Sequence, residues 1–129
     1  MAKRKVLIVE DEEKITASLK VMLTRKGCEV LIAEKGEEAW EIFQKERPQA
    51  CSLDIRLPFS QFDGLELLRR IREIDKEVYC VMLSCLEADV TRGKSKELGA
   101  DAYFEKPLDS EDIFSLLNEL VAGKRNKQE

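Results

Sequence analysis

Three carboxylates follow apolar runs at positions where they could share one ligand. Glu10 and Asp11 come directly after the run Lys5 to Val9, and Asp54 comes directly after Ala50 to Leu53. Hard oxygen donors with room for water suit Mg²⁺, which often takes one or two carboxylates together with phosphate oxygens. The spacing therefore predicts a Mg²⁺ site.

A hydroxyl and an ammonium group follow the two later apolar runs. Ser84 comes after Val78 to Leu83, and Lys106 comes just after Ala102 to Phe104. Both groups bind phosphoryl oxygens. Taken singly, each polar residue has an ordinary explanation, such as a helix N-cap or a solvated lysine. Their combination favours a site that handles a phosphoryl group beside a metal ion.

The composition limits the chemistry further. The 129-residue chain has no histidine, so it lacks the usual general base near neutrality and cannot itself carry phosphohistidine. A net charge of −4 provides no basic face for nucleic acid. No apolar run approaches the roughly 20 residues of a membrane span, and the first run is too short for a signal peptide. We expect one cytoplasmic domain without direct nucleic-acid or membrane contact.

The four cysteines show no metal-binding spacing. They are Cys28, Cys51, Cys80 and Cys85, and no two of them form a CxxC motif. Three lie in or beside apolar runs, as buried free thiols do. The pattern therefore favours small core residues over disulfides or a zinc site.

The elements that must position these residues are short apolar runs alternating with longer amphipathic stretches. This alternation predicts five βα units. Continuous apolar runs are typical of strands buried on both faces, which indicates a parallel sheet. The expected strands are Lys5 to Val9, Glu29 to Ala33, Ala50 to Leu53, Val78 to Leu83 and Ala102 to Phe104.

Apolar stripes at helical spacing lie between and after these strands. The stripes are Ile15, Leu19, Met22 and Leu23; Ala39, Ile42 and Phe43; Leu65, Leu68, Ile71 and Ile74; and Ile113, Leu116, Leu117, Leu120 and Val121. The stretch between Ala88 and Leu98 carries few apolar residues, and its internal Gly93 costs about 1 kcal/mol against alanine. We expect this fourth helix to be the least firmly held.

Alternating strands and helices predict a doubly wound α/β domain with a five-stranded parallel sheet and helices on both faces. The common order is 2-1-3-4-5, the (βα)5 flavodoxin-like arrangement. Ligands then bind outside the carboxyl ends of the first and third strands, where the three carboxylates are expected. The domain is expected to span residues 1–123, with a polar tail at 124–129.

These residues give the chain a resemblance to a known family. From about Lys5 to Val121 it resembles the receiver domain of bacterial two-component response regulators. The matching segments are VLIVEDE at 6–12, LDIRLP at 53–58, MLS at 82–84 and GADAYFEKP at 99–107.

The resemblance implies a phosphorylation-activated switch. In such a switch Asp54 is the phosphoacceptor, and Mg²⁺ is held by Glu10, Asp11, Asp54 and the backbone carbonyl of Arg56. The implied phosphodonor is a sensor histidine kinase or a phosphotransfer protein, and the implied target is an effector domain or a protein partner. The protein would promote its own phosphorylation and dephosphorylation without being a turnover enzyme.

The resemblance also implies how the signal spreads. Ser84 binds the phosphoryl group, Lys106 pairs with it, and the Lys106-Pro107 bond is cis. Movement of Ser84 makes room for the ring of Tyr103. This coupling resets the face made by the last two helices and the strand between them, which is also the expected surface for a homodimer or partner.

Four features depart from the family pattern. The loop at 59–63 is about two residues longer than usual, Glu10 stands where aspartate is commoner, and Cys85 stands where a smaller residue is usual. Because Glu10 reaches further than aspartate, we expect it to pair with Arg56 when no metal is bound. The alternative is a solvated Arg56.

Three other functions compete with this interpretation. A phosphatase or phosphotransferase of the haloacid-dehalogenase type also uses an aspartate nucleophile and Mg²⁺, but it needs a DxD pair where this chain reads Asp54-Ile55-Arg56. A flavin binder needs a phosphate-cradling loop where the chain has four consecutive acidic residues at 10–13. A degenerate receiver that works without phosphorylation would not need the complete set of acidic, hydroxyl and lysine positions.

Overall fold

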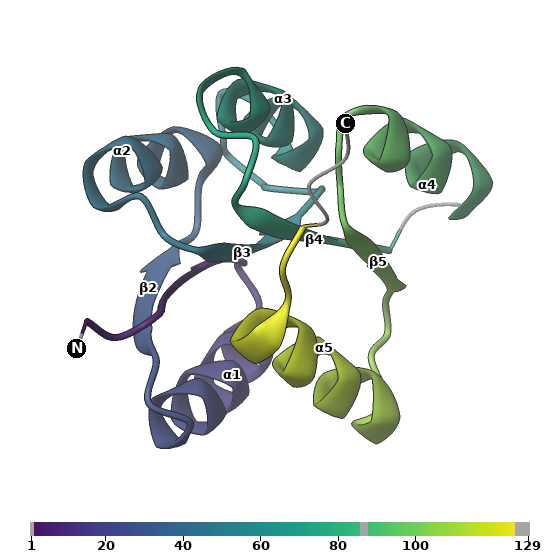
Figure 1. Ribbon diagram of the computed structural model, residues 1–129. Coiled ribbons are helices and arrows are strands. Elements are labelled where there is room, and N and C mark those ends of the chain that lie inside the picture. The colour runs from purple at the N-terminus through teal and green to yellow at the C-terminus, as the bar shows by residue number, and fades with distance from the viewer. Residues whose placement is uncertain (1, 86–87, 126–129) are drawn as a thin grey trace.

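Five parallel strands form one central sheet in the computed structural model, which describes residues 2–85 and 88–125 (Figure 1). The chain alternates strand and helix throughout. The elements are β1 (Lys5–Val9), α1 (Glu13–Arg25), β2 (Glu29–Ala33), α2 (Gly36–Glu46), β3 (Ala50–Asp54), α3 (Gly64–Ile74), β4 (Tyr79–Ser84), α4 (Ala88–Glu97), β5 (Ala102–Glu105) and α5 (Ser110–Ala122).

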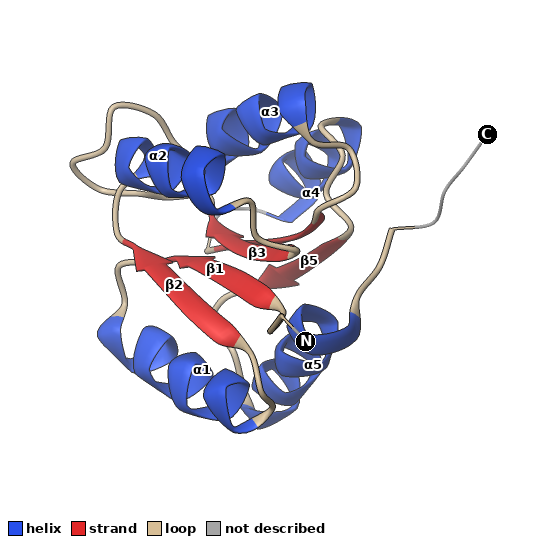
Figure 2. Cartoon of the chain, turned by 60° about the vertical axis from the view of Figure 1, so that its left-hand side comes forward, coloured by secondary structure: helices blue, strands red, loops and turns tan. Residues whose placement is uncertain are grey.

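The strand order is β2-β1-β3-β4-β5, with every neighbouring pair parallel. Figure 2 shows α1 and α5 on one face of the sheet and α2, α3 and α4 on the other. The prediction of a doubly wound sheet in the order 2-1-3-4-5 is confirmed. All five strands therefore end at one edge of the sheet, called here the carboxyl edge, and begin at the opposite amino edge.

Two apolar cores fill the space between the sheet and its helices. On one side Leu19 and Leu23 of α1 and Leu116 and Leu120 of α5 are fully buried. On the other side α2 and α3 bury apolar residues such as Phe43 against the sheet. The stripes in the sequence predicted these faces, since side chains three and four residues apart share one face of a helix.

Three strands extend one residue beyond their predicted ends. Asp54, Ser84 and Glu105 are the last residues of β3, β4 and β5, and β4 begins at Tyr79 rather than Val78. Asp54 is still in register with Leu83 of the neighbouring strand. Backbone pairing continues past the last apolar side chain, so the apolar pattern alone ended the strands too early. The polar side chains thus start from the rigid sheet.

The fourth helix shows the thin packing that its sequence predicts. Among the residues of α4 whose burial the structure describes, 90–97, Ser95 is the one that is buried. Val90 is 77% exposed. Few apolar contacts and exposed backbone are features of segments that open easily.

The remaining bulk expectations concern thiols and membranes. Cys28, Cys51 and Cys80 are buried free thiols, and Cys85 is free and exposed. No helix in the described part of the chain is long and apolar enough to cross a membrane.

Candidate functional site

Three carboxylates meet at the carboxyl edge, between β1 and β3. Glu10 and Asp11 follow the end of β1, and Asp54 ends β3. Oxygen atoms from the three side chains all lie within 4.8 Å of one another. Glu10 and Asp54 are buried, whereas Asp11 is exposed. The structure thus brings together the acidic residues that the sequence predicted for the metal.

Lys106 reaches into this acidic group from the loop after β5. Its Nζ lies 2.8 Å from Oδ2 of Asp54, 2.9 Å from Oε2 of Glu10 and 2.9 Å from Oε1 of Glu12. The Lys106-Pro107 peptide bond is cis. The backbone N–H of Lys106 donates to the carbonyl of Ser84 at 2.7 Å, which ties the loop to the end of β4. The contact with Glu12 was not predicted from the sequence.

Burial governs the ionisation of the inner pair. Desolvation raises the pKa of Glu10 from 4.5 to about 7, and the nearby charge of Asp54 adds to the rise while Lys106 opposes it. Burial alone would lower the pKa of Lys106. Its hydrogen bonds to Asp54, Glu10 and Glu12 outweigh that effect and raise the pKa above its ordinary value. The site therefore holds one firmly charged ammonium beside carboxylates that repel one another.

The carboxylates fit a hard divalent cation. Oε1 of Glu10 is buried and has no hydrogen-bond partner among the described residues. Its other oxygen accepts from the backbone N–H of Glu12 at 3.0 Å, and Oδ1 of Asp54 accepts from that of Arg56 at 3.2 Å. A buried carboxylate oxygen without a donor is costly unless a cation or water meets it. The chemistry and spacing of these oxygens suit Mg²⁺.

An open pocket of about 700 Å³ lies over these groups. Asp11, Asp54 and Lys106 line it, together with Arg56 and Cys85. An approaching phosphodonor would therefore meet the Asp54 carboxylate and the Lys106 ammonium together. Ser84 is fully buried at the end of β4, the strand next to that of Asp54.

Arg56 does not pair with Glu10, so that expectation is wrong. Lys106 takes the available oxygen of Glu10 from within the protein, and Arg56 stays exposed. Nη1 of Arg56 instead lies 4.0 Å from Sγ of Cys85, which is a weak contact. The sequence gave Glu10 two candidate cations, and the buried one has the shorter path.

Tyr103 links β5 to the thinly packed α4. Its hydroxyl hydrogen-bonds with the hydroxyl of Thr91 at 2.5 Å. The guanidinium carbon of Arg92 lies 4.4 Å from the centre of the tyrosine ring, in a cation–π contact. On β5, Tyr103 is in register with Met82, two residues before Ser84 on the neighbouring strand. A shift of this ring would therefore be felt directly by α4.

The long loop between β3 and α3 is anchored on α2. The hydroxyl of Ser60 accepts from the backbone N–H of Gly36 at 3.0 Å, and the N–H of Gln61 donates to Glu37 at 2.9 Å. Phe59 is 93% exposed and has a left-handed φ of 62°. The two additional residues thus form an ordered bridge beside the pocket, which the sequence did not reveal.

Comparisons with known proteins agree with this geometry. The family model described as "Response regulator receiver domain" matches residues 6–118. Sporulation initiation phosphotransferase F of Bacillus subtilis is 33% identical over 98% of this chain and 100% of its own length. The transcriptional regulatory protein TrcR of Mycobacterium tuberculosis is 37% identical over 91% of this chain but 45% of its own length. The chain thus spans less than half of TrcR.

Solved structures give the same result. A CheY-like response regulator receiver domain protein from Methanospirillum hungatei has a TM-score of 0.81 and 29% identity, with 92% of this chain and 93% of that chain covered. The likeness includes the five-stranded order and the five surrounding helices. With the family model, these findings show that the chain belongs to the response regulator receiver domain family, the signalling switches of phosphorelays.

Proposed function

We propose that Asp54 is the residue that takes the phosphoryl group in this switch. The observation that carries the proposal is the position of Lys106, whose ammonium lies 2.8 Å from Asp54 inside a group of three carboxylates. A cation there offsets the repulsion between an aspartate and an anionic phosphodonor. Glu10 and Asp11 would hold Mg²⁺ together with Asp54 and the backbone carbonyl of Arg56.

The transfer itself forms one bond and breaks one. An oxygen of Asp54 attacks phosphorus, the bond from phosphorus to the donor's leaving group breaks, and the leaving group takes its electron pair and a proton from solvent. The product is an acyl phosphate on Asp54. Bound Mg²⁺ supplies charge neutralisation on the phosphoryl oxygens. Lys106 supplies a second positive charge and orients the phosphoryl group.

Phosphorylation changes what Lys106 and Ser84 can bind. The new phosphoryl oxygens give the ammonium of Lys106 partners other than Glu10 and Glu12. The same oxygens accept a hydrogen bond from the hydroxyl of Ser84. Drawing Ser84 toward Asp54 makes space into which the ring of Tyr103 turns.

Helix α4 would read out this movement. Tyr103 contacts Thr91 and Arg92 on α4, so an inward turn of its ring removes both contacts. The surface of α4, β5 and α5 then differs between the two states. A partner, an effector domain or a second copy of the chain that binds one form better shifts the balance toward it. The phosphodonor would be a sensor histidine kinase or a phosphotransfer protein.

The same site would also return the switch to its resting state. Water attacks phosphorus in the acyl phosphate and releases inorganic phosphate, which regenerates the Asp54 carboxylate. Because the domain acts on its own carboxylate, it is not a turnover enzyme. The alternative of a haloacid-dehalogenase-type phosphatase finds no support in the comparisons, which point to receiver domains.

The intact mass of the protein after treatment with phosphoramidate tests this proposal. We expect one added phosphoryl group in the presence of Mg²⁺ or Mn²⁺, and little or none in chelator, because the acidic pocket otherwise repels the donor. Asp54→Asn should remain unlabelled. Asp101→Asn is a matched control outside the site and should still be labelled. Full labelling of Asp54→Asn would refute the assignment.

A further inference from the structure

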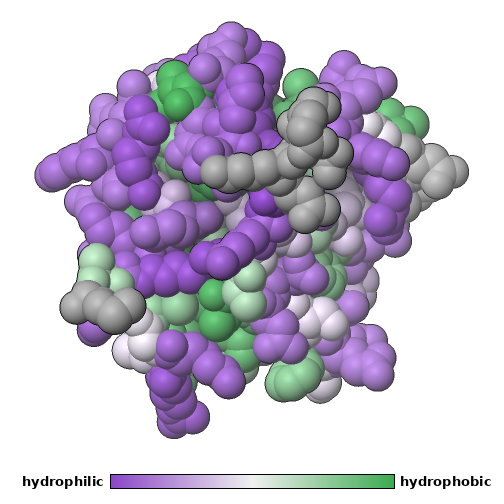
Figure 3. Space-filling model, in the orientation of Figure 1, coloured by the Kyte–Doolittle hydropathy of each residue, from purple (hydrophilic) through white to green (hydrophobic). Residues whose placement is uncertain are grey.

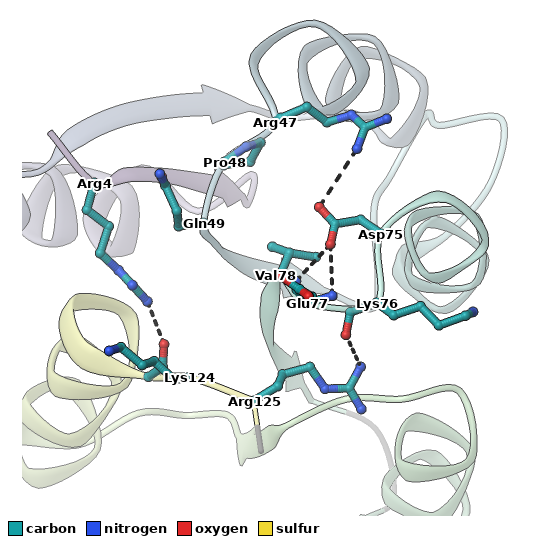
Figure 4. A pocket seen from close by; sticks show the side chains of 11 residues that line it. Arg4, Arg47, Pro48, Gln49, Asp75, Lys76, Glu77, Val78, Lys124 and Arg125 are labelled. Atoms are coloured by element: carbon teal, nitrogen blue, oxygen red, sulfur yellow. Dashed lines mark hydrogen bonds and ion pairs between the residues drawn. The ribbon is translucent and has the colours of Figure 1, made fainter. Parts of the chain in front are cut away.

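A second concave site lies at the amino edge of the sheet, opposite the phosphorylation site (Figure 4). The cavity has a volume of about 700 Å³, within the range of small-molecule sites. Figure 3, which shows the molecule in the orientation of Figure 1, presents this face as mostly hydrophilic. Its basic lining residues are Arg4, Arg47, Lys76, Lys124 and Arg125, against two acidic ones.

Three of these cations have no acidic partner. In residues 2–85 and 88–125, no carboxylate oxygen lies within 4.0 Å of the charged groups of Arg4, Lys76 or Lys124. Arg4 donates to the carbonyls of Leu120 and Gly123 at 2.9 and 2.8 Å. These hydrogen bonds hold the guanidinium in place without supplying a full negative charge. Burial lowers the pKa of Arg4, which shows that the group is partly desolvated.

The carbonyls at the helix ends do not cancel the excess positive charge. The C-termini of α2, α3 and α5 lie at this edge, and each carries about half a negative charge. Of the two carboxylates, Asp75 already accepts from the N–H groups of Glu77 and Val78. Five cations still exceed the carboxylates and helix ends by about one to two charges. That excess matches one phosphate group.

We propose that this cavity binds a small ligand that carries a phosphate group. Arg4 and Lys124 would hold the phosphate, since guanidinium and ammonium groups are the usual donors to it. The side chains of Pro48 and Val78 give the rest of the ligand an apolar surface. No aromatic side chain lines the described cavity, so stacking on a nucleotide base is not part of the site. This inference does not depend on the phosphorylation of Asp54.

Titration of inorganic phosphate and glycerol 3-phosphate, followed by ¹H–¹⁵N NMR, tests the proposal. The titrations are done in chelator, at fixed ionic strength, so that the acidic site does not bind anions. We expect saturable shifts in the amide signals of Gln49 and Val78 and none at Asp54. Tighter binding of the ester indicates an organic phosphate as the ligand, and equal affinities indicate free phosphate. Shifts that do not saturate, or that centre on Asp54, would overturn the proposal.

Variants separate a built site from general charge attraction. Arg4→Gln and Lys124→Gln should each weaken binding about fivefold or more. Lys20→Gln removes the same charge from an exposed position on α1 and should leave the affinity unchanged. If Arg4→Gln fails to fold because α5 loses its contacts with the guanidinium, Lys124→Gln still decides. Equal weakening by Lys20→Gln and Lys124→Gln would overturn the proposal.

Discussion

The two edges of the sheet carry opposite charge and handle it in different ways. At the carboxyl edge Glu10, Asp11 and Asp54 crowd around Lys106, and most of these charges are buried in direct contact. At the amino edge basic side chains surround an open cavity and lie over helix ends. One edge therefore concentrates repulsion at a single point, and the other spreads its charge.

The topology explains the signs. In a sheet of βα units, helices begin at the carboxyl edge and end at the amino edge, so the two edges receive the positive and negative ends of the helix dipoles. Acidic side chains suit the first edge and basic ones the second. Mutual contact among buried carboxylates is not explained by the dipoles. It makes the carboxyl edge the place where a bound cation or a covalent change has the largest effect.

Replacing Lys106 by methionine should have the largest effect on stability. The ammonium is 10% exposed and is the cation nearest to Glu10 and Asp54 in the described structure. Its loss leaves buried carboxylates unpaired, so we expect the free energy of unfolding to fall by about 3 to 5 kcal/mol in chelator. Urea unfolding measures this change. Lys20→Met on the exposed side of α1 is the matched control and should have little effect.

The same variant separates two roles of Lys106. Because the ammonium competes with a metal ion for the carboxylates, Mg²⁺ should bind Lys106→Met more tightly than wild type and restore part of its stability. Signalling after phosphorylation should nevertheless be lost. A collapse of Mg²⁺ affinity in Lys106→Met would mean that the lysine supports the metal site, and its assignment to the phosphoryl group would be wrong.

The second prediction concerns pH. The pKa of Glu10 is about 7 in the folded protein, above its ordinary value of 4.5, so the folded state holds the proton more strongly than the unfolded state. In chelator, this contribution to stability is complete below about pH 4.5 and is lost as the pH rises to about 7. The loss should be on the order of 2 kcal/mol.

Glu10→Gln tests the origin of this pH dependence. Glutamine keeps the size of the side chain but cannot titrate, so the fall in stability between those pH values should become smaller. Unfolding curves at several pH values, recorded in chelator, give the comparison. An unchanged pH profile in Glu10→Gln would assign the effect to other groups.

A smaller effect is expected at the N-terminus of α5, on the carboxyl edge. Asp109 accepts from the N–H of Asp112 at 2.8 Å, and Asp112 accepts in return from the N–H of Asp109 at 3.1 Å. Asp109→Ala removes one side of this capping box and should cost about 1 kcal/mol in thermal or urea unfolding. Ser115→Ala on the exposed side of the same helix should cost much less. Equal losses would show that the cap contributes nothing specific.

The smallest effect is a gain at the amino edge. Arg47 follows α2 with φ 46° and ψ 65°, a left-handed conformation that glycine adopts without strain. Its nearest carboxylate, on Asp75, is 3.9 Å away, so little is lost with the side chain. Arg47→Gly should raise the free energy of unfolding by about 0.5 kcal/mol. Arg47→Ala keeps the strain and should give no gain.

The sequence predicted the carboxyl edge far better than the amino edge. Apolar runs located all five strands, and the strand order then placed Glu10, Asp11, Asp54 and Lys106 together. The basic cavity was missed because its residues come from separate turns. Arg4 and Lys124 lie at opposite ends of the chain, and each looks like an ordinary surface cation until the fold joins them.

Two errors inside the site have a common cause. Glu12 was not recognised as a partner of Lys106, and Arg56 was expected to take Glu10. Both outcomes depend on how far the lysine side chain reaches across the edge, which spacing along the sequence does not determine. Residue types at strand ends predict which groups gather, whereas pairing within the group depends on side-chain paths.

Amide hydrogen exchange with and without phosphorylation of Asp54 tests the central claim, that the carboxyl edge is a switch read out through Tyr103 and α4. In the unmodified protein, α4 should exchange faster than α1, because the described part of α4 buries so little. Phosphorylation in Mg²⁺ should change exchange in α4 and β5 and leave the turns at Pro48 and Val78 unaltered. Protection of α4 equal to that of α1, or an equal response at both edges of the sheet, would contradict the account.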